Sequence, residues 1–242
     1  MIRKLRRPAI LTVLLVATVV PTVYEPVAKI LFPFESAYVY PRIPMLQLLG
    51  QHVVLSGIAT AAAALVGMLV GIIVTRPRGV SLIPLVRDLA ALAQTVPPVA
   101  VLVLAVPLFG FGTKPTVFAL FLFSLLPILG NTITGLQQID SGLLEASTAM
   151  GMRPWRRLVL TELPLAAPVI IAGVRTAAVI SVGTATIGAT IGAGGLGVVI
   201  IAGLVRDNLA FITAGALSAA MVALLVDWGF QMLTDRFIDL SS

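Results

Sequence analysis

The stretch VVLSGIATAAAALVGMLVGIIVT, residues 53–75, contains no Asp, Glu, Lys or Arg. As a helix rising ~1.5 Å per residue, a stretch of this length crosses the ~30 Å hydrocarbon core of a bilayer. Lipid offers no hydrogen-bond partner to an open backbone, so a single uncharged segment crosses it only as a helix. Residues 53–75 therefore predict a membrane-spanning helix and an all-α membrane protein.

Similar stretches occur along the rest of the chain. Of its 242 residues, 59% are hydrophobic and 11% are charged, whereas a soluble domain has about 45–50% apolar and about 25% charged residues. Pro97 and Pro98 lie within one apolar stretch and predict a kink or a break in its helix. We predict six membrane-spanning segments, at residues 8–24, 53–75, 88–109, 115–136, 165–190 and 209–232.

The first segment and the basic residues before it resemble a signal peptide, but no A-x-A-like cleavage site follows Val23. We therefore expect this segment to be retained as a span. The predicted organisation is an N-terminal transmembrane helix at 1–24, an extracytoplasmic loop at 25–52, a core of five transmembrane helices at 53–232 and a cytoplasmic tail at 233–242.

Lys and Arg are distributed unequally between the predicted loops. If the N-terminus is cytoplasmic, eleven of them fall inside and four fall outside. Cytoplasmic loops carry an excess of Lys and Arg, so this distribution predicts that both termini are cytoplasmic. The inside set is Arg3, Lys4, Arg6, Arg7, Arg76, Arg78, Arg87, Arg153, Arg156, Arg157 and Arg236, and the outside set is Lys29, Arg42, Lys114 and Arg206. Because the basic residues flank apolar segments, the net charge of +6 does not indicate nucleic-acid binding.

The residues needed for common catalytic sites are missing from the sequence or isolated in it. There is no cysteine, which excludes disulfides and thiolate metal sites, and His52 is the only histidine. No G-x-x-x-x-G-K-[ST] phosphate-binding loop is present. Residues 192–197 match G-x-G-x-x-G but follow a membrane segment, so we interpret them as a tight outside turn before the sixth span. We expect no catalytic residue, no bound metal and no cofactor on this chain.

The predicted inside loop at 137–164 has the pattern of two short helices. Asp140 or Ser141 is suited to begin the first helix and Gly151 to end it, and Pro154 is suited to begin the second. One face of the first helix is apolar or small, and it consists of Leu143, Ala146, Ser147 and Met150. Such a face docks into a groove of a partner protein or lies on lipid headgroups, and the pattern alone leaves both alternatives open.

The same loop resembles the EAA loop of ABC importer permeases. That family pattern is Glu-Ala-Ala, three residues, Gly, nine residues, Ile, one residue and Leu-Pro. Here Glu145-Ala146-Ser147, Gly151 and Leu163-Pro164 occupy the matching positions. The chain departs from the pattern at Ser147, where Ala is usual, and at Thr161, where Ile is usual.

Further segments are similar to the osmoprotectant branch of this family, which imports glycine betaine, choline, carnitine or proline betaine. The similarity covers most of residues 50–220. It is carried by Gln94-Thr95-Val96-Pro97-Pro98, Gly110-Phe111-Gly112-Thr113-Lys114-Pro115, Leu126-Pro127-Ile128, Asn131-Thr132, Gly173-Val174-Arg175-Thr176-Ala177 and Ile191-Gly192-Ala193-Gly194-Gly195-Leu196-Gly197.

The resemblance implies a type I ABC importer permease fold in the cell inner membrane, with a cytoplasmic coupling helix. It also implies three kinds of protein partner: a dimer of ATP-binding cassette ATPases that holds the ATP and magnesium, an extracytoplasmic substrate-binding protein and a second permease chain. The residues it assigns to ATPase coupling are Glu145, Ala146, Ser147, Met150, Gly151, Trp155, Leu163 and Pro164.

Several polar or small residues within the spans are candidates for the translocation path. Arg175 lies inside the fifth span, where a charge marks either a functional site or a structural pair, with Asp88 or Asp227 as partner. Asn131 is a candidate gate residue near the inside end of the fourth span. Small residues at helical spacing in the fifth span form either a packing face or a lining of the path, and they are Gly173, Ala177, Ser181, Thr184 and Gly188.

We therefore predict the permease subunit of an ATP-driven importer for a small osmoprotectant. One alternative is the same machine with another cargo, such as an amino acid or a sulfonate. The other is a channel or secondary carrier that works alone.

Overall fold

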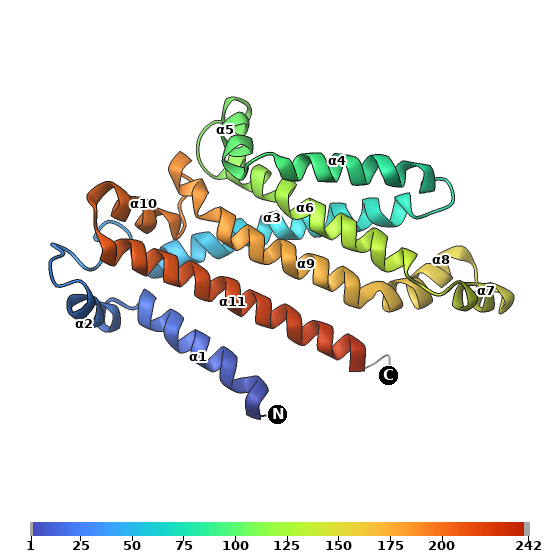
Figure 1. The fold of residues 1–242 in the computed structure, drawn as a ribbon, viewed down its shortest axis with the longest axis horizontal. Helices are drawn as coiled ribbons and strands as arrows, with labels where there is room; N and C mark the ends of the chain where they lie inside the picture. The colour runs from blue at the N-terminus through green and yellow to red at the C-terminus, as the bar shows by residue number, and fades with distance from the viewer. Residues whose placement is uncertain (1, 240–242) are drawn as a thin grey trace.

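The computed structural model describes residues 2–239. Met1 and residues 240–242, the end of the predicted tail, lie outside the described residues, as do the side chains of residues 2–6, 93, 94, 238 and 239. Every regular element in the described range is helical, as the sequence predicts. The long helices run side by side along an elongated molecule, and some of the short helices lie at its two ends (Figure 1).

Four helices are long and apolar enough to cross a membrane: α3 (Met45–Val74), α6 (Thr113–Gln137), α9 (Leu163–Ala185, extended by its flanking turns) and α11 (Leu209–Asp239). Two further helices, α1 (Ile2–Val19) and α2 (Pro21–Leu31), are bent by 81° where they meet, and would make a fifth span if counted together. The described chain therefore has four or five spans by length and composition, and the predicted count of six is not confirmed.

The predicted third span at 88–109 is two helices in the structure. These are α4 (Ile83–Thr95), which follows a short 3-10 turn, η1 (Val80–Leu82), and α5 (Pro98–Phe109). Neither is long enough to cross a bilayer by itself. The helix stops at Val96, which has an extended backbone, because a residue before proline disfavours the helical region. The predicted break at Pro97 and Pro98 is thus confirmed.

The predicted loop at 25–52 is helical at both of its ends, residues 25–31 and 45–52. The first predicted span ends early, at Val19, because Pro21 opens the new helix α2. The second span begins early, at Met45, because Met45 and Leu48 are buried and add a further apolar turn to α3. Only residues 32–44 lie between the two helices.

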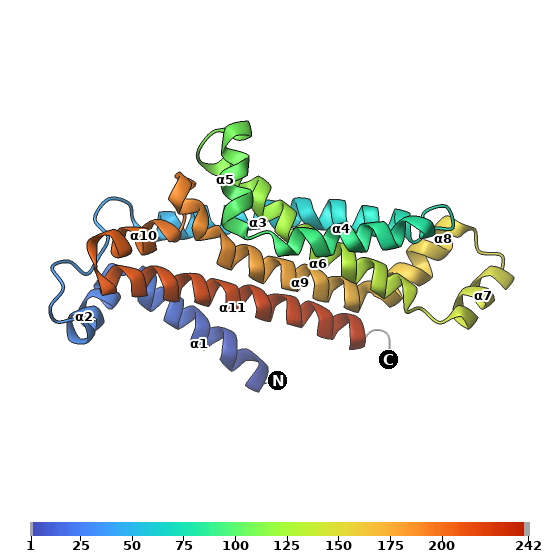
Figure 2. The ribbon, with the colours of Figure 1, turned by 45° about the horizontal axis from the view of Figure 1, so that its top comes forward.

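Helix α9 lies at the centre of the bundle and packs on α6, α11 and α3 (Figure 2). Small residues allow these close approaches, as they do between other membrane helices. A Cβ atom added at Gly71 of α3 would lie 2.6 Å from Thr132 of α6. The N-terminal helix α1 packs on α11, where Ser218 Oγ donates a 2.9 Å hydrogen bond to Thr18 Oγ1.

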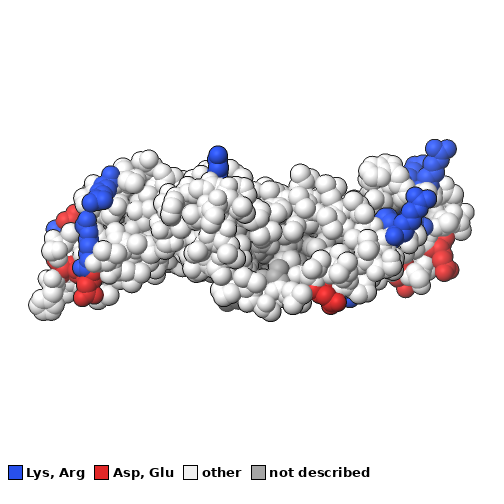
Figure 3. Space-filling view, turned by 90° about the horizontal axis from the view of Figure 1, so that it is seen from above, with Lys and Arg blue, Asp and Glu red and all other residues white. Residues whose placement is uncertain are grey.

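Charged residues gather at the two ends of the molecule, and the surface between them carries few charges (Figure 3). One end holds α7 (Ser141–Ala149) and α8 (Pro154–Arg157). The opposite end holds α2 and α10 (Gly197–Arg206), which follows the 3-10 helix η3 (Ile187–Ile191). This separation of charged ends from an apolar middle is the distribution that a bilayer requires.

Candidate coupling hairpin and membrane-embedded ion pair

Helices α7 and α8 form a hairpin, residues 140–157, at one end of the bundle. Asp140 caps the first helix, because its Oδ1 accepts a 3.2 Å hydrogen bond from Leu143 N. Gly151 ends it with a φ of +76°, a left-handed conformation suited to glycine. Gly151 N donates to Thr148 O at 2.9 Å and Met152 N donates to Ser147 O at 3.2 Å, so these two carbonyls near the end of α7 are satisfied. The predicted start and stop of this helix are confirmed.

The second helix of the hairpin runs without interruption into the membrane segment. Pro154 is its first residue, as predicted, and a π-helical turn, η2 (Leu158–Glu162), follows α8 directly. Leu163 and Pro164 then form the first turn of α9 instead of marking a break between two elements. Leu163 is half-buried and Pro164 is exposed.

The hairpin exposes most of the residues that the sequence assigned to it. Leu143, Met150 and Trp155 are 50%, 70% and 73% exposed, so the hairpin carries uncovered apolar side chains at a charged end of the molecule. Glu145, Ala146 and Gly151 are also exposed. Ser147 is an exception, since it is only 2% exposed and its Oγ donates to Leu144 O within α7. Ser147 is therefore not on the exposed surface that Leu143, Ala146 and Met150 share, because α7 turns its side chain toward its own chain.

Sequence reasoning missed Glu162, the buried carboxylate at the base of the hairpin. Its side chain is 5% exposed and accepts hydrogen bonds from Arg76 Nη2 at 2.6 Å and Arg157 Nε at 2.9 Å. Arg157 Nη1 also donates to Thr148 Oγ1 on α7 at 2.9 Å. One signal was available: Glu162 is the only acid between Glu145 and Asp207.

Arg175 of α9 forms a two-pronged ion pair with Asp227 of α11. Arg175 Nε lies 2.5 Å from Asp227 Oδ1, and Nη2 lies 2.7 Å from Oδ2. Of the two partners predicted for a structural pair, Asp227 and not Asp88 is the one that Arg175 contacts. The two side chains remain 33% and 35% exposed within this chain, so the pair lies at a surface of the bundle and not in its core.

Most of the small residues at helical spacing in α9 and η3 are packed within this chain. Gly173, Ala177, Ser181 and Gly188 are buried between helices, and Thr184 is half-buried. Ser181 Oγ donates to Ser56 O of α3 at 3.3 Å and is 1% exposed. Within this chain, Ser181 therefore lies at a contact between α3 and α9 and not on an open surface.

Asn131 of α6 lies against Gly173 of α9. It is half-buried, and its side-chain amide donates to Pro127 O one turn earlier at 2.8 Å. A Cβ at Gly173 would approach Asn131 Cβ to 2.6 Å and Pro127 O to 2.9 Å. The geometry places Asn131 at a tight crossing of α6 and α9.

Two glycines of α9 allow this packing to be tested. Replacing Gly173 with Ala is expected to lower the free energy of unfolding by about 1–3 kcal/mol, because backbone atoms of α6 must move. Gly183→Ala is the matched control, since nothing lies within 4 Å of its added Cβ and alanine favours the helix by about 0.5–1 kcal/mol. Thermal unfolding in detergent micelles measures both, and equal melting temperatures for the two variants would contradict the close crossing.

The glycine-rich segment 192–197 is a tight turn, as predicted, although α10 separates it from the last span. Gly192, Gly194 and Gly195 have φ angles of +84°, +84° and +76°. Gly195 N donates to Gln51 Oε1 at 3.1 Å, and the neighbouring His52 is fully buried with Nε2 2.9 Å from Val182 O. Among the residues that the structure describes, no group of three acidic or histidine side chains is placed to hold a metal ion.

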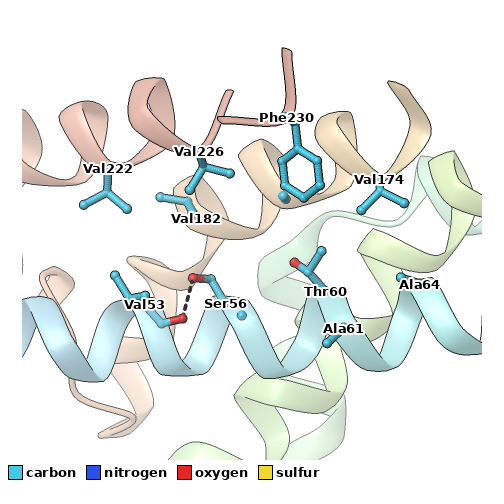
Figure 4. Close-up of a pocket in the computed structure, with 12 residues that line it drawn as sticks. Val53, Ser56, Thr60, Ala61, Ala64, Val174, Val182, Val222, Val226 and Phe230 are labelled. Carbon is cyan, nitrogen blue, oxygen red and sulfur yellow. Dashed lines mark hydrogen bonds between the residues drawn. The ribbon is translucent and has the colours of Figure 1, made fainter. Parts of the chain in front are cut away.

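A hollow of about 270 Å³ lies between α3, α9 and α11 (Figure 4). Thr60 and Ser56 of α3 contribute its few polar atoms, and Phe230 of α11 closes one side. The other lining residues are Val53, Gly57, Ala61, Ala64, Val174, Ala178, Val182, Val222 and Val226. Because no charged side chain lines it, this hollow offers no counter-charge to a charged or zwitterionic solute.

Comparison with known proteins agrees with this architecture. The chain is 43% identical over 178 residues to the carnitine transport permease protein OpuCD of Listeria monocytogenes serotype 1/2a (strain 10403S), covering 73% of this chain and 79% of that protein. It is 39% identical over 183 residues to the osmoprotectant import permease protein OsmW of Salmonella typhimurium, covering 74% and 84%. It is 39% identical over 179 residues to the choline transport system permease protein OpuBB of Bacillus subtilis, covering 74% and 81%.

The fold is also similar to a chain of the MetNI methionine ABC transporter, solved in inward-facing conformations. The TM-score is 0.70 at 22% sequence identity, and the match covers 81% of this chain and 99% of that chain. Finally, residues 65–239 match the family model described as the binding-protein-dependent transport system inner membrane component. This chain is therefore a member of the binding-protein-dependent transport system inner membrane component family of ABC transporter permeases.

Proposed function

We propose that this chain is the translocating subunit of an ATP-driven importer for a small osmoprotectant such as glycine betaine, carnitine or choline. One observation carries the cargo class: relatives named for carnitine, osmoprotectant and choline transport are 39–43% identical to this chain over about three quarters of its length. The carrier of the energy is a separate ATPase, since the chain has no phosphate-binding loop.

In this proposal the α7–α8 hairpin is the coupling site for the ATPase dimer, which holds ATP and magnesium. Its support is the exposed apolar surface of Leu143, Met150 and Trp155, beside the exposed Glu145 and Ala146. A short helix with this surface fits a groove of a partner. Gly151 gives the sharp turn that presents it, while Leu163 and Pro164 connect it to α9.

The proposed topology has six crossings of the cell inner membrane, with α4 and α5 together as the third, and both termini in the cytoplasm. It is supported by the excess of Lys and Arg in the predicted inside segments. The substrate-binding protein then docks at the end that carries α2 and α10. The translocation path lies between this chain and a second permease chain.

The proposed path-facing surface of this chain is the exposed stripe of α9. No other helix of this chain covers this stripe, and its residues Ala172, Thr176, Ile180 and Gly183 are exposed. The Arg175–Asp227 pair stands at the edge of the stripe, and Thr184 is half-buried near its outer part. A charged pair that is one-third exposed is unfavourable against lipid, so water or a second chain is the expected neighbour.

Uptake by the reconstituted complex tests the proposal. Purified chain is combined in proteoliposomes with its ATPase and binding protein, and entry of radiolabelled glycine betaine, choline and carnitine is followed. We expect the solute to accumulate only when ATP is present on the side of the membrane that the ATPase faces and the binding protein is present on the other side. Equal uptake by the chain alone would instead identify a channel or secondary carrier. ATP-driven uptake of methionine or a sulfonate, without uptake of the three osmoprotectants, would assign another cargo.

A further inference from the structure

Glu162 joins parts of the chain that are far apart in sequence. Its Oε2 accepts from Arg76, which directly follows the C-cap of α3, and its Oε1 accepts from Arg157 at the end of α8. Arg157 in turn holds Thr148 of α7. One carboxylate thus connects α3, the π-helical turn and both helices of the hairpin.

The burial of Glu162 indicates that these bonds are maintained. A buried carboxylate is stable only when opposite charges and hydrogen bonds replace its water. Here the side chain is 5% exposed, while Arg76 and Arg157 are 29% and 26% exposed. Each oxygen has its own guanidinium, so neither arginine is redundant. Arg76 is oriented further by its bond from Nε to Ile72 O at 3.2 Å.

The hairpin has little other support from the bundle. Helix α7 packs mainly on α8, and α8 packs mainly on the π-helical turn that follows it. Such turns are local irregularities that often mark functional positions in helices. The hairpin is joined to α9 through this turn, and its backbone makes no comparable contact with α3. The side chains of Glu162 and Arg76 therefore provide its connection to α3.

We propose that Glu162 is a positioning residue that locks the α7–α8 hairpin to the inner end of α3. Movement of the hairpin is then transmitted to α3 and α9 together, instead of being absorbed by bending at residues 158–162. This inference rests on the proposed function, in which an ATPase moves the hairpin. The lock itself is a property of this chain and is measured without the ATPase.

The geometric part of the proposal is tested by a distance measurement. The chain has no natural cysteine, so Arg78→Cys and Ala149→Cys, both at exposed positions, give a specific spin-label pair between the α3–α4 connection and α7. Pulsed electron paramagnetic resonance on the purified chain in nanodiscs is expected to give a narrow distance distribution. Glu162→Gln is expected to widen it, by about twofold, because the hairpin is then free to pivot.

Arg76→Gln is the second variant. Because it leaves Glu162 paired with Arg157, it should fold even if Glu162→Gln does not. It is expected to widen the same distribution, and the double variant is expected to widen it no further than Glu162→Gln alone. Asp88→Asn is the matched control, an exposed acid of α4 for which no ion pair is found among the described residues. It should leave the distribution narrow. A narrow distribution in either Arg76→Gln or Glu162→Gln would overturn the lock.

The functional part is tested in the assembled transporter. Glu162→Gln and Arg76→Gln are expected to keep ATPase binding and ATP hydrolysis, while uptake per ATP hydrolysed falls by about tenfold. Loss of hydrolysis and uptake in equal proportion would overturn the role in transmission. If the unmodified chain binds no ATPase, the proposed function fails while the distance measurement still decides the lock.

Discussion

A chain carrying Glu145→Arg is expected to insert and fold normally but to lose its binding to the ATPase. Glu145 is exposed on α7, and no ion pair holds it among the described residues, so its replacement should change the free energy of unfolding by less than about 0.5 kcal/mol. At an interface, reversal of a paired charge costs about 2–5 kcal/mol. Co-purification of the ATPase with the chain measures the loss, which should be about 30-fold or more in affinity.

Two further variants sharpen this test. Asp88→Arg makes the same charge reversal outside the hairpin, on the exposed side of α4, and should leave co-purification unchanged. Gly151→Pro should also abolish it, because proline fixes φ near about −65° whereas Gly151 has a φ of +76° and donates its N–H to Thr148 O. Normal recovery of the ATPase with both Glu145→Arg and Gly151→Pro would remove the hairpin as the coupling site.

Local sequence patterns predicted the parts of this fold that depend on local chemistry. The uncharged run at 53–75 predicted a spanning helix, and Pro97 and Pro98 predicted the break that separates α4 from α5. Asp140 or Ser141 predicted the start of α7 and Gly151 its end, by their capping chemistry. Each of these depends on neighbours within a few residues, so the sequence contains the relevant information.

The features that sequence reasoning missed depend on contacts between distant residues. Glu162 and Arg76 are 86 residues apart, and nothing in either segment identifies the other as its partner. The same limit applies to Ser147. Helical spacing placed it on the apolar face of α7, but spacing does not show which side of α7 packs against the rest of the protein. The pairing of Arg175 with Asp227 was one of two alternatives, since both acids lie near predicted inside ends.

Replacing Arg175 with Met is expected to produce a large loss of stability. The change removes the partner of Asp227 and leaves an unpaired carboxylate at a partly exposed surface of the bundle, within its membrane-spanning part. Breaking a fully buried pair costs about 3–5 kcal/mol, and partial exposure of these side chains, 33% and 35%, reduces our expectation to about 2–3 kcal/mol. Thermal unfolding in detergent and the yield of monodisperse protein measure the effect. Arg206→Met, at an exposed position of α10, is the control and should change neither.

The double variant Arg175→Met with Asp227→Leu separates structure from transport. Replacing both charges by apolar groups of similar size removes the unpaired carboxylate, so stability should return to within about 1 kcal/mol of the unmodified chain. If the double variant is as unstable as Arg175→Met, the loss of stability in the single variant does not come from the unpaired carboxylate of Asp227.

Nε and Nη2 of Arg175 already donate to the two oxygens of Asp227. We therefore expect the pair to act as a structural link between α9 and α11 and not as a cargo site. The stable double variant should therefore import glycine betaine and choline at rates within a few-fold of the unmodified transporter. Glycine betaine carries both a carboxylate and a cation, whereas choline carries only the cation. A selective loss of glycine betaine uptake would show that Arg175 contacts the cargo carboxylate, because removal of a purely structural pair has no means of distinguishing the two solutes.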